Sequence, residues 1–246
     1  LDIALWDCYG RSLGFPLWKV WNGDLKEFPV YGSGCYRGLG HDGMIEKAKN
    51  YVRKGFKSIK MQVAHCFSNK EDILNVRDMR NSLGDDIGLM IDVNQGWGVE
   101  ETIKVCKEID KYNPEWIEEP IMADDFEGYN LICNSINTPI VTGENNFTHN
   151  DLLPLMKNKK IRILQPDIMR GGYTNLLLTS RLADEYGLKI APHMFPELSI
   201  HINASIKNPS WLEYMGWYDH LWKEPLLPNN GTLKPTNRPG HGMDFK

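Results

Sequence analysis

The sequence predicts an α/β protein whose strands close into a TIM-type barrel, a ring of parallel strands surrounded by helices. Eight short β-rich runs recur along the 246 residues, amphipathic helical stretches separate them, and most of the runs end at an ionisable residue. Parallel strands need helical crossovers, and active sites of such barrels lie at the C-terminal ends of the strands. A doubly wound open sheet fits less well, because eight units is many and no G-x-G-x-x-G follows an early strand.

The expected strands and helices alternate along the chain. In order, the strand runs are FPVYGSG at 28–34, FKSIKMQV at 56–63, IGLMIDVN at 87–94, PEWIEEP at 114–120, TPIVTGEN at 138–145, IRILQPD at 161–167, GLKIAPH at 187–193 and SWLEYMG at 210–216. Helical spacing of apolar residues is clear over 71–84, 99–112 and 175–187. This alternation supplies the crossovers that a parallel barrel needs.

The first residues form a further element outside this pattern. The segment LDIALWDCYGRSLG has helical spacing, with Leu1, Leu5 and Cys8 on one stripe and Gly14 as the expected C-terminal stop. Because the sequence begins inside this helix and without Met, we expect a segment upstream of it. We assign residues 1–25 to a helix and linker, and 26–246 to the barrel and a loop-like C-terminal closure.

Composition limits the class of partner. The chain is 41% hydrophobic and 24% charged, which suits one globular domain with a substantial core. Its net charge is −4, with no basic block, no apolar run long enough for a bilayer and no signal peptide, so neither nucleic acid nor a membrane is expected as partner. The five scattered cysteines never form C-x-x-C, and we expect reduced, mostly buried thiols in a cytoplasmic protein.

Ionisable residues follow the predicted strands at nearly constant spacing. Asp92, Glu118 and Glu144 are separated by 26 and 26 residues, Asp167 follows after 23 and His193 after another 26. Glu213 comes 20 residues later. Because each stands at the C-terminal end of a strand, we expect them to meet at one mouth of the barrel.

Three carboxylates at one mouth would repel each other unless a cation lay between them. Hard divalent cations take oxygen ligands, and Mg²⁺ binds a few carboxylates while keeping positions for water and substrate. We therefore expect a metal at Asp92, Glu118 and Glu144. The alternative for each carboxylate is a helix cap or a pair with a surface lysine.

His193, Asp167 and Lys60 are candidates for proton transfer. An aspartate that accepts from one imidazole nitrogen fixes the tautomer and raises the basicity of the other nitrogen. Lys60 lies on the second strand, across the barrel from His193, and shares a strand face with Gln62. A metal opposite a base indicates removal of a proton next to a carboxylate. A structural histidine and a solvated lysine are the alternatives.

The motifs in this order resemble the enolase superfamily, and within it the mandelate racemase-like subgroup. The resemblance covers nearly the whole chain, through ALWDCYGRSLGFPLWKVWNG, GFKSIKMQV, IDVNQGW, WIEEP, GEN, QPDIMRGG, PHMFPELS and RPGHGMDF. It implies a modified (β/α)₇β barrel, with the usual N-terminal α+β capping domain missing from this chain and residues 1–25 leading out of it. It also implies a homo-oligomer.

The resemblance further implies roles for single residues. Asp92, Glu118 and Glu144 would bind Mg²⁺, and His193 with Asp167 would act as acid and base. Glu213 is similar to a glutamate that hydrogen-bonds the substrate carboxylate, and Asn94 to a residue beside metal and substrate. Apart from the resemblance, Tyr36, His65 and Arg170 of the barrel are weaker candidates for contact with a small carboxylate substrate, and ordinary loop residues are the alternative.

One position departs from the family. Its Lys-x-Lys motif reads Lys60-Met61-Gln62 here, so Gln62 stands where the second base would be, and an amide cannot take a proton near pH 7. His193 acting alone could remove the α-proton and then protonate a β-hydroxyl leaving on the same face. The hypothesis is therefore syn dehydration of a sugar acid, an aldonate or aldarate, to a 2-keto-3-deoxy acid.

Three rival functions remain. The first is a racemase, epimerase or cycloisomerase in which Lys60 is the second base. The second is a non-catalytic relative that binds a carboxylate, although loss of a metal ligand or of the His193–Asp167 pair would be expected of it. A Schiff-base aldolase using Lys60 ranks last, because it leaves the three carboxylates without a task.

Overall fold

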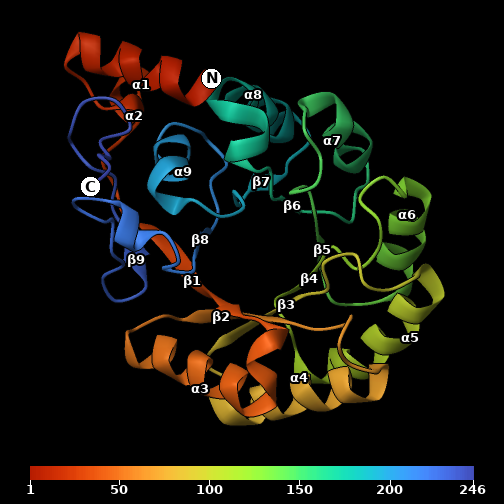
Figure 1. The fold of residues 1–246 in the computed structure, drawn as a ribbon. Coiled ribbons are helices and arrows are strands. Elements are labelled where there is room, and N and C mark those ends of the chain that lie inside the picture. Colours follow the sequence, from red (N-terminus) through yellow and green to blue (C-terminus); the bar gives the residue numbers. More distant parts are fainter.

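The computed structural model describes residues 1–246 and shows the predicted barrel (Figure 1). Seven strand–helix units and an eighth strand surround a common centre, with the helices outside. The eighth strand is followed by the short 3-10 turn Asp219–Leu221 and not by an α-helix. The architecture is therefore the modified (β/α)₇β barrel that the motifs predict.

Each of the eight predicted runs contains a strand. The strands are β1 Phe28–Cys35, β2 Ser58–Gln62, β3 Gly88–Asp92, β4 Trp116–Glu118, β5 Ile140–Val141, β6 Ile163–Leu164, β7 Lys189–Ile190 and β8 Leu212–Tyr214. A ninth, β9 Thr232–Leu233, pairs antiparallel with β1. The seven strands β2 to β8 are shorter than their runs at both ends, whereas β1 continues one residue beyond its run.

The strands pair in the order of a closed barrel. A parallel sheet runs β5-β4-β3-β2-β1-β8, and β6 pairs with β7. Single bridges join the two parts, Thr142 with Leu164 between β5 and β6, and Ile190 with Pro209 between β7 and the approach to β8. All C-terminal strand ends therefore face one mouth.

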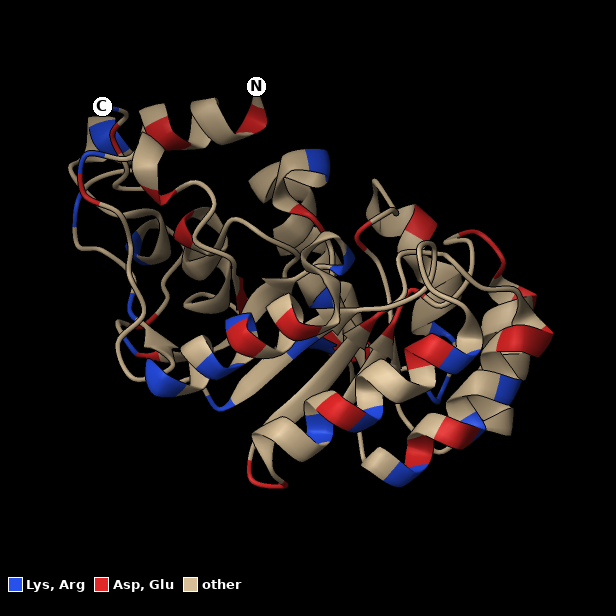
Figure 2. Ribbon diagram, turned by 60° about the horizontal axis from the view of Figure 1, so that its bottom comes forward, with Lys and Arg blue, Asp and Glu red and all other residues tan.

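The outer helices follow the strands in turn. They are α3 Gly40–Arg53, α4 Asn69–Leu83, α5 Val99–Ile109, α6 Phe126–Ser135, α7 His149–Met156, α8 Ile168–Glu185 and α9 Pro196–Asn203. Ser68 and Glu71 form a capping box at the start of α4, as expected for S-x-x-E. Helix α8 begins seven residues before the predicted helical stretch, because Asp167 caps it. Acidic and basic residues alternate along several of these helices (Figure 2).

The N-terminal helix packs on a different face from the predicted stripe. Helix α1, Asp2–Leu13, ends at Gly14 with φ of 70°, as predicted, and α2 is Leu17–Val20. Leu1, Leu5 and Cys8 are exposed, however. Ile3 and Trp6 face the α8 cluster instead, and α1 lies beside α8 in Figure 1.

The strand register builds the inside of the barrel in layers. Lys60 pairs with Met90 and Met90 with Trp116, while Gln62 pairs with Asp92 and Asp92 with Glu118. Residues two apart on a strand share a face. Met90 and Trp116 belong to a small inner apolar cluster, so Asp92 and Glu118 stand one layer closer to the mouth.

All five cysteines are free, and three of them, Cys35, Cys106 and Cys133, are buried. Cys8 and Cys66 are exposed. None of the helices combines the length and apolar character that a membrane span requires.

Candidate active site

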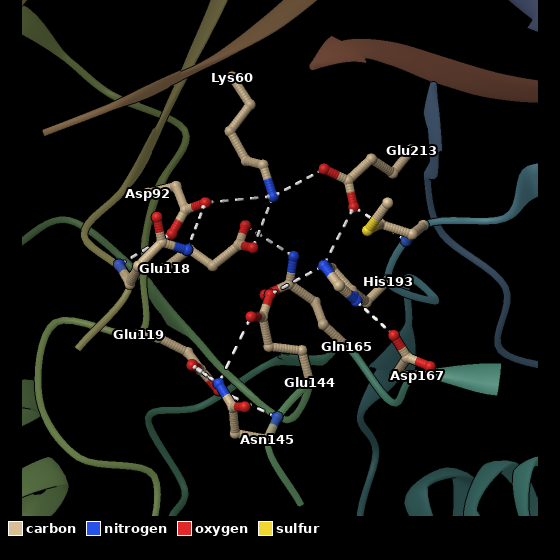
Figure 3. Close-up of polar contacts among 12 residues, drawn as sticks. Lys60, Asp92, Glu118, Glu119, Glu144, Asn145, Gln165, Asp167, His193 and Glu213 are labelled. Atoms are coloured by element: carbon tan, nitrogen blue, oxygen red, sulfur yellow. Dashed lines mark hydrogen bonds and ion pairs between the residues drawn. The ribbon is translucent and has the colours of Figure 1, made fainter. Parts of the chain in front are cut away.

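The predicted site residues meet at the barrel mouth (Figure 3). Asp92 and Glu118 end β3 and β4, Glu213 lies within β8, and Glu144, Asp167 and His193 follow β5, β6 and β7. Lys60 reaches the same space from β2. All the acidic side chains in this group are buried, so their charges are held in a poorly solvated space.

Lys60 is the central cation of the group. Its Nζ lies 2.6 Å from Glu118 Oε1, 2.9 Å from Glu213 Oε1 and 3.8 Å from Asp92 Oδ2, and the residue is 3% exposed. Burial alone would lower the pKa of Lys60, but Glu118 and Glu213 hold it well above 10.5. Lys60 is therefore an ammonium group in this arrangement.

The carboxylates differ in how well their charge is compensated. Burial raises the pKa of Glu118 and Glu144 to about 7 and that of Asp92 to about 6, and repulsion among the three adds to it. Burial would also raise the pKa of Glu213, but Lys60 and His193 lower it to about 2. The group thus carries more negative charge than its cations neutralise.

His193 lies against Asp167. Its Nδ1 lies 2.6 Å from Asp167 Oδ2, and its Nε2 lies 3.2 Å from Glu144 Oε2 and 4.0 Å from Glu213 Oε2. Burial lowers the pKa of His193, but Asp167, Glu144 and Glu213 together raise it to about 9. Nε2 faces the carboxylate group and is the atom available for proton transfer.

Asn94 and Gln62 flank Asp92. Asn94 donates from its backbone N and Nδ2 to the two oxygens of Asp92, both at 3.0 Å, and accepts from Arg37 Nη2 at 2.7 Å. Gln62 pairs with Asp92 in the strand register and is partly exposed at the mouth. Gln62 therefore stands beside the carboxylate group from the side of β2.

Of the three weaker candidates, Tyr36 and His65 lie in loops after β1 and β2, and Arg170 lies in the first turn of α8. Tyr36 is exposed and its ring meets that of Trp217 edge-on at 6.3 Å. His65 Nε2 lies 2.9 Å from the Asn94 carbonyl oxygen. Arg170 Nη2 donates to Asn145 Oδ1 at 2.9 Å. Each therefore already has a partner within the protein.

Three polar residues of the site had no role in the sequence interpretation. Gln165 Nε2 donates to Glu118 Oε2 at 2.8 Å, and Asn145 Nδ2 donates to Glu119 Oε2 at 2.5 Å. Both Gln165 and Glu119 are fully buried. The available signal was their place in the motifs QPD, WIEEP and GEN, beside the predicted site residues Asp167, Glu118 and Glu144.

The backbone around the mouth is strained. Seven of the ten non-glycine residues with positive φ follow β2, β3, β4 and β7, namely Ala64, His65, Asn94, Gln95, Glu119, Met194 and Phe195. Such conformations cost about 1–3 kcal/mol each and cluster at functional sites. Their position supports the mouth as the functional end of the barrel.

The carboxylates suit a hard cation in their chemistry, but their present spacing is not that of a metal centre. Glu144 Oε2 is buried and accepts no hydrogen bond, and the donors are all carboxylate oxygens. Yet no three His, Cys, Asp or Glu side chains are arranged to hold one ion, since Lys60 Nζ lies between Asp92 and Glu118. The ligand assignment of Asp92, Glu118 and Glu144 therefore stays a prediction.

Residues 43–246 match the Enolase C-terminal domain-like family. A 3,6-anhydro-alpha-L-galactonate cycloisomerase of Streptomyces coelicolor is 32% identical over all of this chain and 69% of its own length. An L-talarate/galactarate dehydratase of Salmonella typhimurium is 33% identical, over all of this chain and 61% of its own length. The chain thus spans about two thirds of these relatives.

A solved structure agrees with these matches. The crystal structure of a racemase from Streptomyces coelicolor with bound magnesium superposes with a TM-score of 0.94 at 31% identity, covering 99% of this chain and 68% of the racemase. The barrel topology, the motifs and the family match all lead to one assignment. The chain belongs to the enolase superfamily.

Proposed function

We propose that this protein removes the α-proton of a sugar acid in a Mg²⁺-dependent reaction and then expels the β-hydroxyl from the same face, giving a 2-keto-3-deoxy acid. The observation that carries the proposal is the asymmetry of the mouth. His193, held by Asp167, is a proton carrier on one side, and Gln62 stands on the β2 side where a second base would be needed for racemisation.

Asp92, Glu118 and Glu144 are the proposed Mg²⁺ ligands. Their buried carboxylate oxygens and excess negative charge suit a hard divalent cation, as the magnesium in the related racemase structure supports. When bound, Mg²⁺ would offset the negative charge that grows on the substrate carboxylate as the α-proton leaves. Lys60 would have to give up part of its contact with Asp92 and Glu118.

His193 would perform both proton transfers. A cation held at Glu144 would offset the negative charge that raises the pKa of His193 to about 9, and the imidazole could then lose its Nε2 proton. The free Nε2 takes the α-proton, while the proton on Nδ1 stays hydrogen-bonded to Asp167. The imidazolium then gives the proton on Nε2 to the β-hydroxyl. One C–H and one C–O bond break in the substrate, and water leaves. The resulting enol takes a solvent proton at C3 and becomes the keto acid.

Lys60, Glu213, Asn94 and Gln62 are the proposed substrate contacts. Lys60 can turn its ammonium from Glu213 to the substrate carboxylate. Glu213 accepts hydrogen bonds as it stands, because its pKa is lowered to about 2 by Lys60 and His193. It can donate to a carboxylate only after Lys60 has turned away. Asn94 and Gln62 offer amide groups for hydroxyls.

Isomerisation is the second candidate, since one of the two relatives above is a cycloisomerase. Lys60 would then act as the second base. It is less favoured because the ammonium, paired with Glu118 and Glu213, would first have to lose its proton. A non-catalytic role is weaker still, since every predicted ligand and both members of the His193–Asp167 pair are present.

Proton NMR in D₂O tests the proposal, with Mg²⁺ and a panel of aldonic and aldaric acids. We expect one acid to give a 2-keto-3-deoxy product with solvent deuterium at C3. Deuterium entering the α-position of an acid that loses no water would favour isomerisation. Absence of both reactions, with Mg²⁺ and acid bound, would favour the non-catalytic reading.

A further inference from the structure

We infer that Asn145 is a positioning residue that sets the orientation of Glu144 and ties it to the start of α8. The inference rests on the proposed function, because it takes Glu144 as a Mg²⁺ ligand. It concerns three residues without a proposed catalytic role, Glu119, Asn145 and Arg170.

Both ends of the Asn145 amide are engaged. Its Nδ2 donates to Glu119 Oε2 at 2.5 Å and to Glu144 Oε1 at 3.4 Å, and its Oδ1 accepts from Arg170 Nη2 at 2.9 Å (Figure 3 shows the two carboxylate contacts). The backbone N of Asn145 also donates to Glu119 Oε1 at 3.4 Å. Only an uncharged group with donor and acceptor on opposite sides can make this set of contacts.

Glu119 is the fixed end of the network. It is fully buried, its backbone N donates to the Val141 carbonyl oxygen, and its own carbonyl oxygen accepts from Gln95 N. No cation lies within ion-pair distance of its carboxylate, which instead accepts from Asn145 and Thr142. A carboxyl group buried in this way holds its donors tightly, because losing them would leave its buried oxygens without hydrogen bonds.

Glu144, in contrast, has few restraints of its own. Its Oε1 accepts a hydrogen bond from Asn145, and its Oε2 accepts none but forms an ion pair with His193 Nε2 at 3.2 Å. The Asn145 contact is therefore the side-chain hydrogen bond that selects the orientation of this carboxylate. A rigid Glu119 transmits its position to Glu144 through one amide.

Arg170 extends the network toward the His193–Asp167 pair. Its guanidinium stacks over Phe147 at 5.3 Å, and its backbone N donates to Asp167 Oδ1 at 3.0 Å. Asn145 therefore links a proposed metal ligand to the helix turn that carries the aspartate partner of His193. Residues that orient ligands in this way typically change metal affinity by about 10–100-fold when removed.

The alternative is that Asn145 has a structural role alone, in which its contacts with Glu119 join the loops after β4 and β5. Mg²⁺ affinity separates the two, measured by calorimetry on the 246-residue chain together with urea unfolding. Asn145→Leu removes the amide at similar volume. Asn208→Leu is the matched control, because its Nδ2 donates to Ser180 O and Leu188 O and the residue lies before β8, at the opposite end of the barrel.

We expect Asn145→Leu to weaken Mg²⁺ binding at least tenfold and Asn208→Leu to leave it unchanged, although both lower stability. If Asn145→Leu does not fold, Asn145→Ser, whose side chain is too short for the three contacts, carries the same expectation. The inference would be overturned if the Asn145 variant kept its Mg²⁺ affinity, or if both variants lost affinity equally. In either case, Mg²⁺ binding by the wild-type chain would still support the proposed metal site. A wild-type chain that bound no Mg²⁺ would overturn both.

Discussion

Asp167 divides its two carboxylate oxygens between a helix and His193. Oδ1 accepts from the backbone N of Met169 and Arg170 at 2.6 and 3.0 Å, and Oδ2 meets His193 Nδ1 at 2.6 Å. The two hydrogen bonds to Oδ1 cap α8 and so prevent the carboxylate from rotating. The helix therefore fixes the partner that fixes the imidazole.

Asp167→Asn should separate the capping of α8 from the orientation of His193. The asparagine can still cap α8 with its oxygen, but its NH₂ would then face His193 Nδ1 and favour the wrong tautomer. We expect turnover to fall by about 10²–10⁴-fold with little change in stability, because asparagine caps a helix about as well as aspartate. Asp125→Asn is the control, since Asp125 caps α6 through Gly128 N and touches no histidine. Turnover within threefold of wild type in the Asp167 variant would refute the assignment.

Lys60→Met should be strongly destabilising. Lys60 neutralises the buried Glu118 and Glu213, and removing one partner of a buried ion pair costs about 3–5 kcal/mol. Urea unfolding would measure the loss, and Mg²⁺ should restore part of it by mass action. Lys111→Met is the control, because Lys111 pairs with Glu108 on the surface and should contribute little. Equal effects of the two substitutions would show that the mouth is well solvated.

His201 should make the protein less stable in mild acid. Burial lowers its pKa to about 4, and its ring accepts from Trp18 N at Nδ1 and donates to the His241 carbonyl oxygen at Nε2. Below pH 6.5 the unfolded chain takes a proton at this position and the folded chain does not, so the contribution is complete above pH 6.5 and falls as pH drops to 4. At 1.36 kcal/mol per unit the loss reaches about 3 kcal/mol.

The difference in unfolding free energy between wild type and His201→Gln, measured from pH 7 to pH 4, isolates this contribution from that of the carboxylates. We expect the wild type to lose its advantage over the variant as pH falls. The exposed His220→Gln should follow the wild-type curve. Parallel curves for wild type and His201→Gln would contradict the assignment of a buried neutral imidazole.

Much of the fold and the position of the site could be predicted from the sequence, because both depend on local pattern. Apolar runs that end near Asp92, Glu118 and His193 locate the strand ends, and this prediction does not depend on the contacts that the side chains make. The packing face of α1 could not be predicted, since Ile3 and Trp6 are partly buried against a cluster that includes residues of α8, 160 or more residues away. Nor could the ion pairs of Lys60 with Glu118 and Glu213 be predicted, because the strand period fixes the face on which a side chain lies but not its rotamer.

The network around Asn145 could not be predicted either, because local sequence pattern does not show which side chain faces which partner. Glu118 and Glu119 are adjacent and chemically alike, and only the alternation of the strand end decides which faces Lys60 and which faces Asn145. The ligand roles, the division at residue 25 and a homo-oligomer stay predictions.

Gln62→Lys should add a base on the second side of the mouth. Gln62 pairs with Asp92 in the register and is partly exposed, so a lysine there could reach the α-carbon of a bound acid from the face opposite His193. Because inversion needs one base on each face, we expect the variant to gain epimerisation or deuterium exchange with inversion, detected by NMR in D₂O. Gln62→Met, which has similar length and no proton to exchange, is the control. Wild-type protein that already inverts its substrate would show that Lys60 reaches the second face, and would replace dehydration by isomerisation as the function.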